Sequence, residues 1–178
     1  MALIVEDGTG LPNADALISV LDVTAYHAAR GNAAWASVSY TEAAKEAAIR
    51  RATAFLSNSF TWAGLRTHAR NQALAWPRSG VSDQEGNGID SDEIPIEVSD
   101  ACAEIALREL VSPGAMNPDF TSSELVKREK IGQIEVEYAL RSANADAQRP
   151  VLLVVRDMIS QFLKAGSGNP IVGKSFRV

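Results

Sequence analysis

Apolar residues recur at helical spacing in four stretches of this chain, and this pattern predicts four helices. The stretches cover residues 19–30, 39–57, 95–111 and 150–165. In the second, charged residues occupy the face opposite an apolar stripe formed by Ala48, Ile49, Ala52, Phe55 and Leu56. The third stretch is apolar around most of its surface, which predicts that it is the central, most buried helix. The expected fold is mainly α, a small bundle of about four helices.

Capping and stop residues mark the ends of these helices. Ser19 with Asp22, and Ser39 with Glu42, fit a capping box at the start of the first and second helices. Proline suits the first turn of a helix, so the third is expected to begin near Pro95 and the fourth at Pro150. The expected stops are Gly31, Pro113-Gly114 and Gly166-Ser167-Gly168.

The periodicity changes from helical to alternating after Asn117-Pro118. Ile134, Val136 and Tyr138 alternate with Glu135 and Glu137, which is the two-residue period of a strand. Residues 126–130 are the expected partner strand, with a turn near residues 131–132. The sequence therefore predicts a β-hairpin over about residues 125–140.

A cluster of proline and glycine residues separates the second and third helices. Pro77 restricts the backbone of Trp76 before it, and three glycines follow within the segment from Trp76 to Pro95. We expect a rigid, shaped loop that holds the central helix against the bundle. Arg78 and Asp83 of this loop are candidate contacts with a neighbouring subunit.

The length of 178 residues predicts one helical domain over residues 1–165. Residues 166–178 are expected to form a tail that is flexible or bound to a partner. No run approaches the ~20 apolar residues of a membrane helix, so no membrane contact is expected. Cys102 is the sole cysteine, which excludes an intrachain disulfide. The formal net charge of −5 disfavours tight, nonspecific binding to nucleic acid.

Two segments match functional motifs without the structural context that those motifs need. Residues 168–175 fit the phosphate-binding pattern GxxxxGK[ST], but a helix is predicted before them and none after them. Residues 83–88 resemble the start of a calcium-binding EF-hand loop, yet the twelfth position is Ile94 instead of glutamate. His27, His68 and Cys102 lack partners in any catalytic or metal-binding pattern. We therefore expect no enzyme activity, no cofactor and no metal site.

Several segments occur in an order that resembles a known family. The ordered set runs from about Ser19 to Phe162 and comprises Tyr26–Gly31 with Trp35, Ala47–Thr53, Trp76–Val81, Ile89-Asp90 with Ile94-Pro95, Ala103–Ala106, and Glu129–Gly132 with Val136–Tyr138. It resembles the tailed-phage proteins labelled DnaT-like single-stranded-DNA-binding. That group is itself similar to the head–tail connector, or adaptor, proteins of long-tailed phages.

The adaptor resemblance implies a structural virion protein of the head–tail neck, assembled in the cytoplasm of the bacterial host. Typically twelve copies form a ring beneath the portal protein, a neck or tail protein docks on the tail side, and double-stranded DNA passes through. The free edge of a hairpin can pair with a neighbouring subunit, and such a contact can close into a ring. The tail is a further candidate interface with the portal or a neighbour, through Ile171, Val172, Lys174 and Phe176.

The DnaT-like label implies a different role, binding of exposed single strands during phage replication. A single-strand-binding protein needs a positively charged groove with stacking aromatic residues. A DNA conduit, in contrast, works with an acidic or mixed lining. The net negative charge therefore favours the adaptor, and single-stranded-DNA binding stays open as the alternative.

Overall fold

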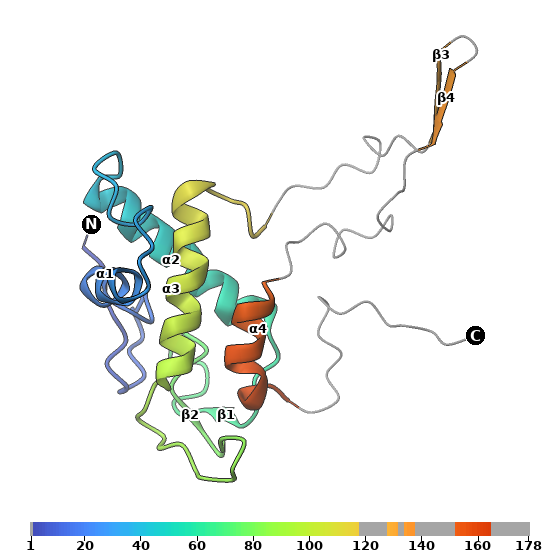
Figure 1. Cartoon of the computed structure of the whole chain (residues 1–178). Coiled ribbons are helices and arrows are strands. Elements are labelled where there is room, and N and C mark those ends of the chain that lie inside the picture. The colour runs from blue at the N-terminus through green and yellow to red at the C-terminus, as the bar shows by residue number, and fades with distance from the viewer. Residues whose placement is uncertain (1, 118–127, 132–133, 138–151, 165–178) are drawn as a thin grey trace, which may run out of the picture.

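The computed structural model describes residues 2–117, 128–131, 134–137 and 152–164 (Figure 1). Its elements in chain order are α1 (Val20–Ala29), α2 (Glu42–Ser59), β1 (Leu65–Arg66), β2 (Arg78–Ser79), α3 (Ile96–Val111), β3 (Arg128–Ile131), β4 (Ile134–Glu137), α4 (Leu153–Ile159) and the short 3₁₀ helix η3 (Ser160–Phe162). These elements confirm the predicted mainly α fold with a β-hairpin. Residues 165–178, which include the whole predicted tail, lie outside the described residues.

Helix α3 lies at the centre of the helical body and packs against α1, α2 and α4 (Figure 1). Its buried side chains lie around most of the helix and are Val98, Ala101, Cys102, Ala103, Ile105, Ala106, Glu109 and Leu110. This confirms the prediction of a central, most buried helix. Burial raises the pKa of the Cys102 thiol to about 12, as expected of a core thiol and not of a nucleophile.

The helix starts agree with the sequence at α1 and α3 but not at α2. The Ser19 hydroxyl accepts a hydrogen bond from the Asp22 N–H at the start of α1, and Pro95 directly precedes α3. At α2 the capping residue is Thr41, whose hydroxyl accepts from the Ala44 N–H. The expected cap at Ser39 is therefore wrong. Both residues have a suitable hydroxyl, and the helix begins at the one that directly precedes Glu42.

Helix α4 is shorter than the predicted fourth helix of residues 150–165. It begins at Leu153 and passes into η3 after Ile159. Its buried side chains are Val155, Ile159 and, in η3, Phe162. Val154, which the sequence predicts to lie on the same apolar face as Val155 and Phe162, is 38% exposed. The tighter winding of η3 brings Phe162 onto the buried face.

Aromatic packing fixes the loop between α2 and α3 to the end of α4. Trp76 is fully buried, and its ring meets those of Trp62 and Phe162 edge-on at 5.6 Å between centroids in both pairs. The Trp76–Pro77 peptide bond is cis, and β2 follows it directly and pairs antiparallel with β1. The start of the loop is therefore part of the core, which the expectation of a rigid, shaped connection did not specify.

Strands β3 and β4 form the predicted hairpin. They pair antiparallel, with Arg128 opposite Glu137 and Lys130 opposite Glu135. Among the named elements, each of these strands contacts the other and no helix. The outer edge of each described strand is thus without a partner strand in the described part of the chain.

The N-terminal arm folds back along the body before α1. Val5 forms a parallel bridge with Ala16, and the buried Glu6 carboxylate accepts hydrogen bonds from the N–H groups of Gly8, Gly10 and Leu11. At Gly8 a Cβ atom would come within 1.9 Å of the Asp92 carbonyl oxygen. The arm therefore lies against the segment that leads into α3.

Candidate functional site

The two loop residues predicted from the sequence lie in different environments. Arg78 is buried, and its guanidinium donates to the carbonyl oxygens of Ala63, Gly64 and Ala75 at 2.6–3.0 Å. Burial lowers the pKa of Arg78 from its usual value, but the three carbonyls hold the charged group in place. These bonds give Arg78 a role within its own chain, and its contact with a neighbouring subunit stays a prediction.

The Asp83 side chain stabilises the turn that begins at this residue. Its carboxylate accepts from the N–H groups of Glu85 and Asn87 and from the Asn87 side chain at 2.8–2.9 Å. These hydrogen bonds, led by the one from the Asn87 side chain, lower the pKa of Asp83. The arrangement is the Asp/Asn/Gly turn that the calcium-like segment forms instead of an EF-hand loop. The four tail candidates, Ile171, Val172, Lys174 and Phe176, lie outside the described residues.

Most arginines of the helices are neutralised by carboxylates. The ion pairs of the described residues are Arg30–Asp100, Arg50–Asp15, Arg50–Glu46, Arg51–Glu109 and Arg108–Glu104. Arg66 and Arg70, near β1, form no ion pair with another described residue. The helical surface therefore carries mixed charge rather than a positive groove.

The three tryptophans are not available for stacking on bases. Trp35, Trp62 and Trp76 are 1%, 6% and 0% exposed. The large exposed hydrophobic residues of the described part of the chain are all aliphatic. The sequence prediction that the tryptophans serve core packing or loop anchoring is confirmed.

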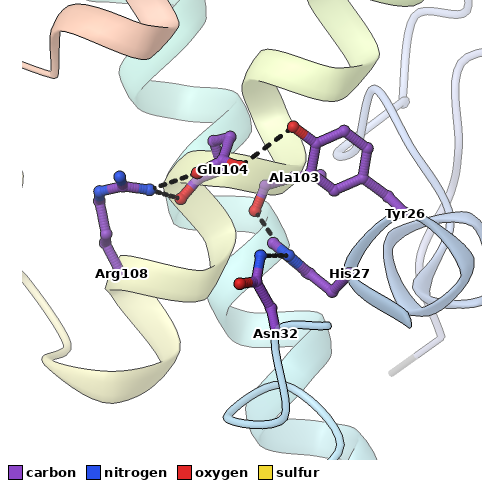
Figure 2. A network of polar contacts seen from close by, with 6 residues as sticks. All are labelled: Tyr26, His27, Asn32, Ala103, Glu104 and Arg108. Carbon is purple, nitrogen blue, oxygen red and sulfur yellow. Dashed lines mark hydrogen bonds and ion pairs between the residues drawn. The ribbon is translucent and has the colours of Figure 1, made fainter. Parts of the chain in front are cut away.

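A polar network connects α1 with α3 in the interior of the bundle (Figure 2). The Glu104 carboxylate accepts from the Tyr26 hydroxyl at 3.0 Å and from the Arg108 guanidinium at 2.7 Å. Burial, together with the hydrogen bond to Glu104, raises the pKa of Tyr26 to about 12. Burial acts to raise the pKa of Glu104, but the hydrogen bonds from Arg108 and Tyr26 outweigh it and lower that pKa. The network therefore holds Glu104 ionised between its two donors.

His27 is buried next to this network, and its hydrogen bonds fix its tautomer. Its Nε2 lies 3.0 Å from the Ala103 carbonyl oxygen, which can only accept, so Nε2 carries the proton. Nδ1 then accepts from the Asn32 side chain at 3.1 Å (Figure 2). With both nitrogens engaged and burial lowering the pKa of His27, this residue is a structural link and not a general base.

Acidification is expected to destabilise the fold through His27. The pKa of His27 is lowered in the folded state from 6.5, so the unfolded state binds the proton more readily. The contribution of the neutral His27 ring to the free energy of unfolding is fully present at pH values above 6.5, the pKa of His27 in the unfolded chain. This contribution is lost as the pH falls below 6.5 toward the lower pKa of the folded state. Urea unfolding at pH 7.5 and 5.5 should show this fall, and His27→Gln should flatten it. An unchanged pH dependence in His27→Gln would contradict this role.

A groove of about 700 Å³ lies between the N-terminal arm, α1 and the start of α3. Its apolar lining includes Leu17, Ile18 and Ile96, and its polar lining includes Asp22 and Asp100. Sequence reasoning missed this groove, because its walls come from segments about 90 residues apart that no local pattern connects.

Within ranges 2–117, 128–131, 134–137 and 152–164, no helix has the length and apolar character needed to cross a membrane. Over the same residues, no three His, Cys, Asp or Glu side chains group in a way that would hold a metal ion.

Comparison with known proteins relates the chain to one family. A family model with the description "Putative DnaT-like ssDNA binding protein" matches residues 1–178. The chain belongs to this family. Membership in the DnaT-like family agrees with the resemblance found in the sequence. The family description names single-stranded-DNA binding, which is the alternative function given above. The family match gives no support to the hypothesis of a head–tail connector. Searches of curated proteins and of solved structures found no match to this DnaT-like chain.

Proposed function

We propose that this DnaT-like family member is a structural, ring-forming protein of the phage neck that surrounds DNA without gripping it. The observation that carries the proposal is the placement of aromatic and basic side chains in the described helical body. Its tryptophans are buried, and most of its helical arginines are paired with carboxylates. Binding of single strands relies on exposed aromatic rings in a positively charged groove, whereas a conduit requires weak contact with its cargo.

The hairpin supplies a means of assembly. Strands β3 and β4 pair with each other and with no further strand of the described chain, so each has an edge open to a neighbouring subunit. An edge contact between different surfaces of two copies is heterologous and closes into a ring if the rotation permits. In this proposal the ring docks on the portal protein on one side and on a neck or tail protein on the other.

Single-stranded-DNA binding is the second candidate, and the family match favours it. In this case Arg66 and Arg70 are the described residues best placed to contact phosphates. They lie four positions apart in the β1 segment and the turn after it, and neither forms an ion pair with another described residue. The acidic partners that neutralise the helical arginines are absent from this segment.

DNA binding separates the two candidates. The adaptor proposal predicts no micromolar binding of a fluorescent oligo-dT to the full chain at moderate salt, measured by anisotropy. The second candidate predicts binding that weakens about tenfold or more in Arg66→Glu/Arg70→Glu, because two phosphate contacts become repulsive. Arg156→Glu on α4 is the control for each of the two single changes, Arg66→Glu and Arg70→Glu, because all three alter the net charge by the same two units. Micromolar binding that is sensitive to the double change but not to the control would contradict the adaptor proposal.

Portal binding provides the complementary test. The purified chain should co-sediment with portal rings and appear as a ring on them in electron micrographs. Failure to bind the portal of its own phage, together with salt-sensitive binding of single strands, would favour the second candidate.

A further inference from the structure

The groove beside the N-terminal arm combines an apolar floor with a negatively charged rim. Leu17 and Ile18 form buried parts of the lining, while Ile96 is 71% exposed at the first position of α3. An isoleucine exposed to this degree beside buried apolar residues is suited to be covered by another chain.

Charge at the groove is strongly one-sided. Four carboxylates belong to the described lining, from Glu6, Asp7, Asp22 and Asp100, against one cation, Arg30. Arg30 lies 3.5 Å from Asp100 and stacks over the Tyr26 ring at 3.4 Å, so these two charges compensate each other. The buried Glu6 carboxylate accepts from three backbone N–H groups, which leaves Asp7 and Asp22 as the negative charge available to an occupant. The groove therefore favours an occupant that is apolar and positively charged.

The chain contains a segment with this chemistry. Residues 165–178 include no Asp or Glu, and they carry Lys174 and Arg177 interleaved with Ile171, Val172 and Phe176. In an extended segment, Lys174 lies on the same face as Val172 and Phe176. That single face can therefore bring both apolar side chains and a cation to a groove with an apolar floor and an acidic rim.

The positions of the two surfaces indicate that the occupant comes from another copy. Residues 165–178 begin after Lys164, whose N–H donates to the Thr61 carbonyl oxygen near the end of α4. The groove lies beside α1, and α1 and α4 lie on opposite sides of α3 (Figure 1). A tail that starts beside α4 and a groove that lies beside α1 favour a head-to-tail contact between copies, which is the kind that closes into rings.

We propose that the groove binds the segment Asn169–Val178 of a second copy of this chain. This inference rests on the proposed ring and adds a specific subunit contact to it. Fully extended, residues 165–178 reach at most about 46–50 Å, so the segment can also fold back onto its own chain. Occupancy within one chain is therefore an outcome that the experiment must separate.

Cross-linking of the full chain tests the contact. In the double variant Ser99→Cys/Ser175→Cys, a short bismaleimide joins the groove wall to the tail, while the native Cys102 is buried and unreactive. The expected result is a ladder of covalent dimers and higher oligomers. A product cross-linked only within one chain would overturn the second-copy contact, and the absence of cross-links would overturn the groove as the binding surface.

Further variants identify the chemistry of the contact. Ile96→Lys should lower the yield of oligomers about tenfold, since it removes apolar burial and repels the basic tail. Val111→Lys, the same change at an exposed position at the far end of α3, should leave the yield unchanged. Phe176→Asp changes only the tail and should reproduce the loss in an intact body. Equal yields in all three variants would overturn the inference.

The outcomes remain distinct from those of the adaptor proposal. Rings that assemble normally on the portal with Ile96→Lys would contradict the groove contact and leave the adaptor function intact. Normal cross-linking in a chain that does not bind the portal would contradict the adaptor function alone.

Discussion

Replacement of Glu109 with alanine is expected to lower the free energy of unfolding by about 3 kcal/mol. Glu109 is 2% exposed, and its carboxylate accepts from Arg51 Nε at 2.7 Å and from the N–H groups of Gly114 and Met116 at 2.8 and 3.0 Å. Its removal leaves these donors without their acceptor. Arg51 is 38% exposed and regains water, so the loss stays near the lower end of the range for a broken buried ion pair.

A surface ion pair provides the control for this prediction. Glu46→Ala breaks the pair between Glu46 and Arg50 on α2, whose carboxylate side chain is 19% exposed against 2% for Glu109. This pair is expected to contribute at most about 1 kcal/mol. Urea unfolding followed by circular dichroism measures both variants. If the two substitutions cost the same, the Glu109 carboxylate does not hold the end of α3 as described.

Trp76→Ala is expected to destabilise the protein by about 3–5 kcal/mol and to loosen α4. The indole is fully buried and contacts Trp62 on one side and Phe162 on the other. Its loss leaves a cavity where the loop meets the end of α4. Hydrogen exchange should therefore accelerate in Leu153–Ile159 more than in Ile96–Val111, in addition to the fall in the unfolding midpoint.

Trp76→Phe separates packing from hydrogen bonding. The Trp76 Nε1 atom is buried and has no hydrogen-bond partner among the described residues, so phenylalanine removes an unpaired polar group while keeping an aromatic ring. We expect a cost well below that of alanine. A cost equal to that of Trp76→Ala would show that the indole N–H has a partner that stabilises the fold.

The helices were predictable because local patterns determine them. Residues 96–111 are apolar around the helix and follow a proline, and no tertiary information is needed to identify them as the centre of the bundle. The cap of α2 was not determined in this way. Ser39 and Thr41 both have hydroxyls that can cap a helix, so the sequence leaves two possible starts, and in the structure Thr41 is the cap.

The interaction partners of the buried charged residues could not be predicted from the sequence. Arg78 was expected to face outward, as arginine usually does, but three backbone carbonyls surround it in the folded chain. Glu109 gives no sign in the sequence that it is buried, because its partners come from α2 and from the turn after α3. Groups of this kind become visible only when separate segments have been brought together.

The lack of contact between α1 and α4 has a mechanical consequence for a ring. Among the named elements, α1 contacts α2 and α3, whereas α4 contacts α3 and η3. If neighbouring copies are joined on these two sides, tension around the circumference crosses each subunit through α3. The close packing around α3, in which Cys102 and Ile105 are fully buried, would then resist stretching of the proposed ring during passage of DNA.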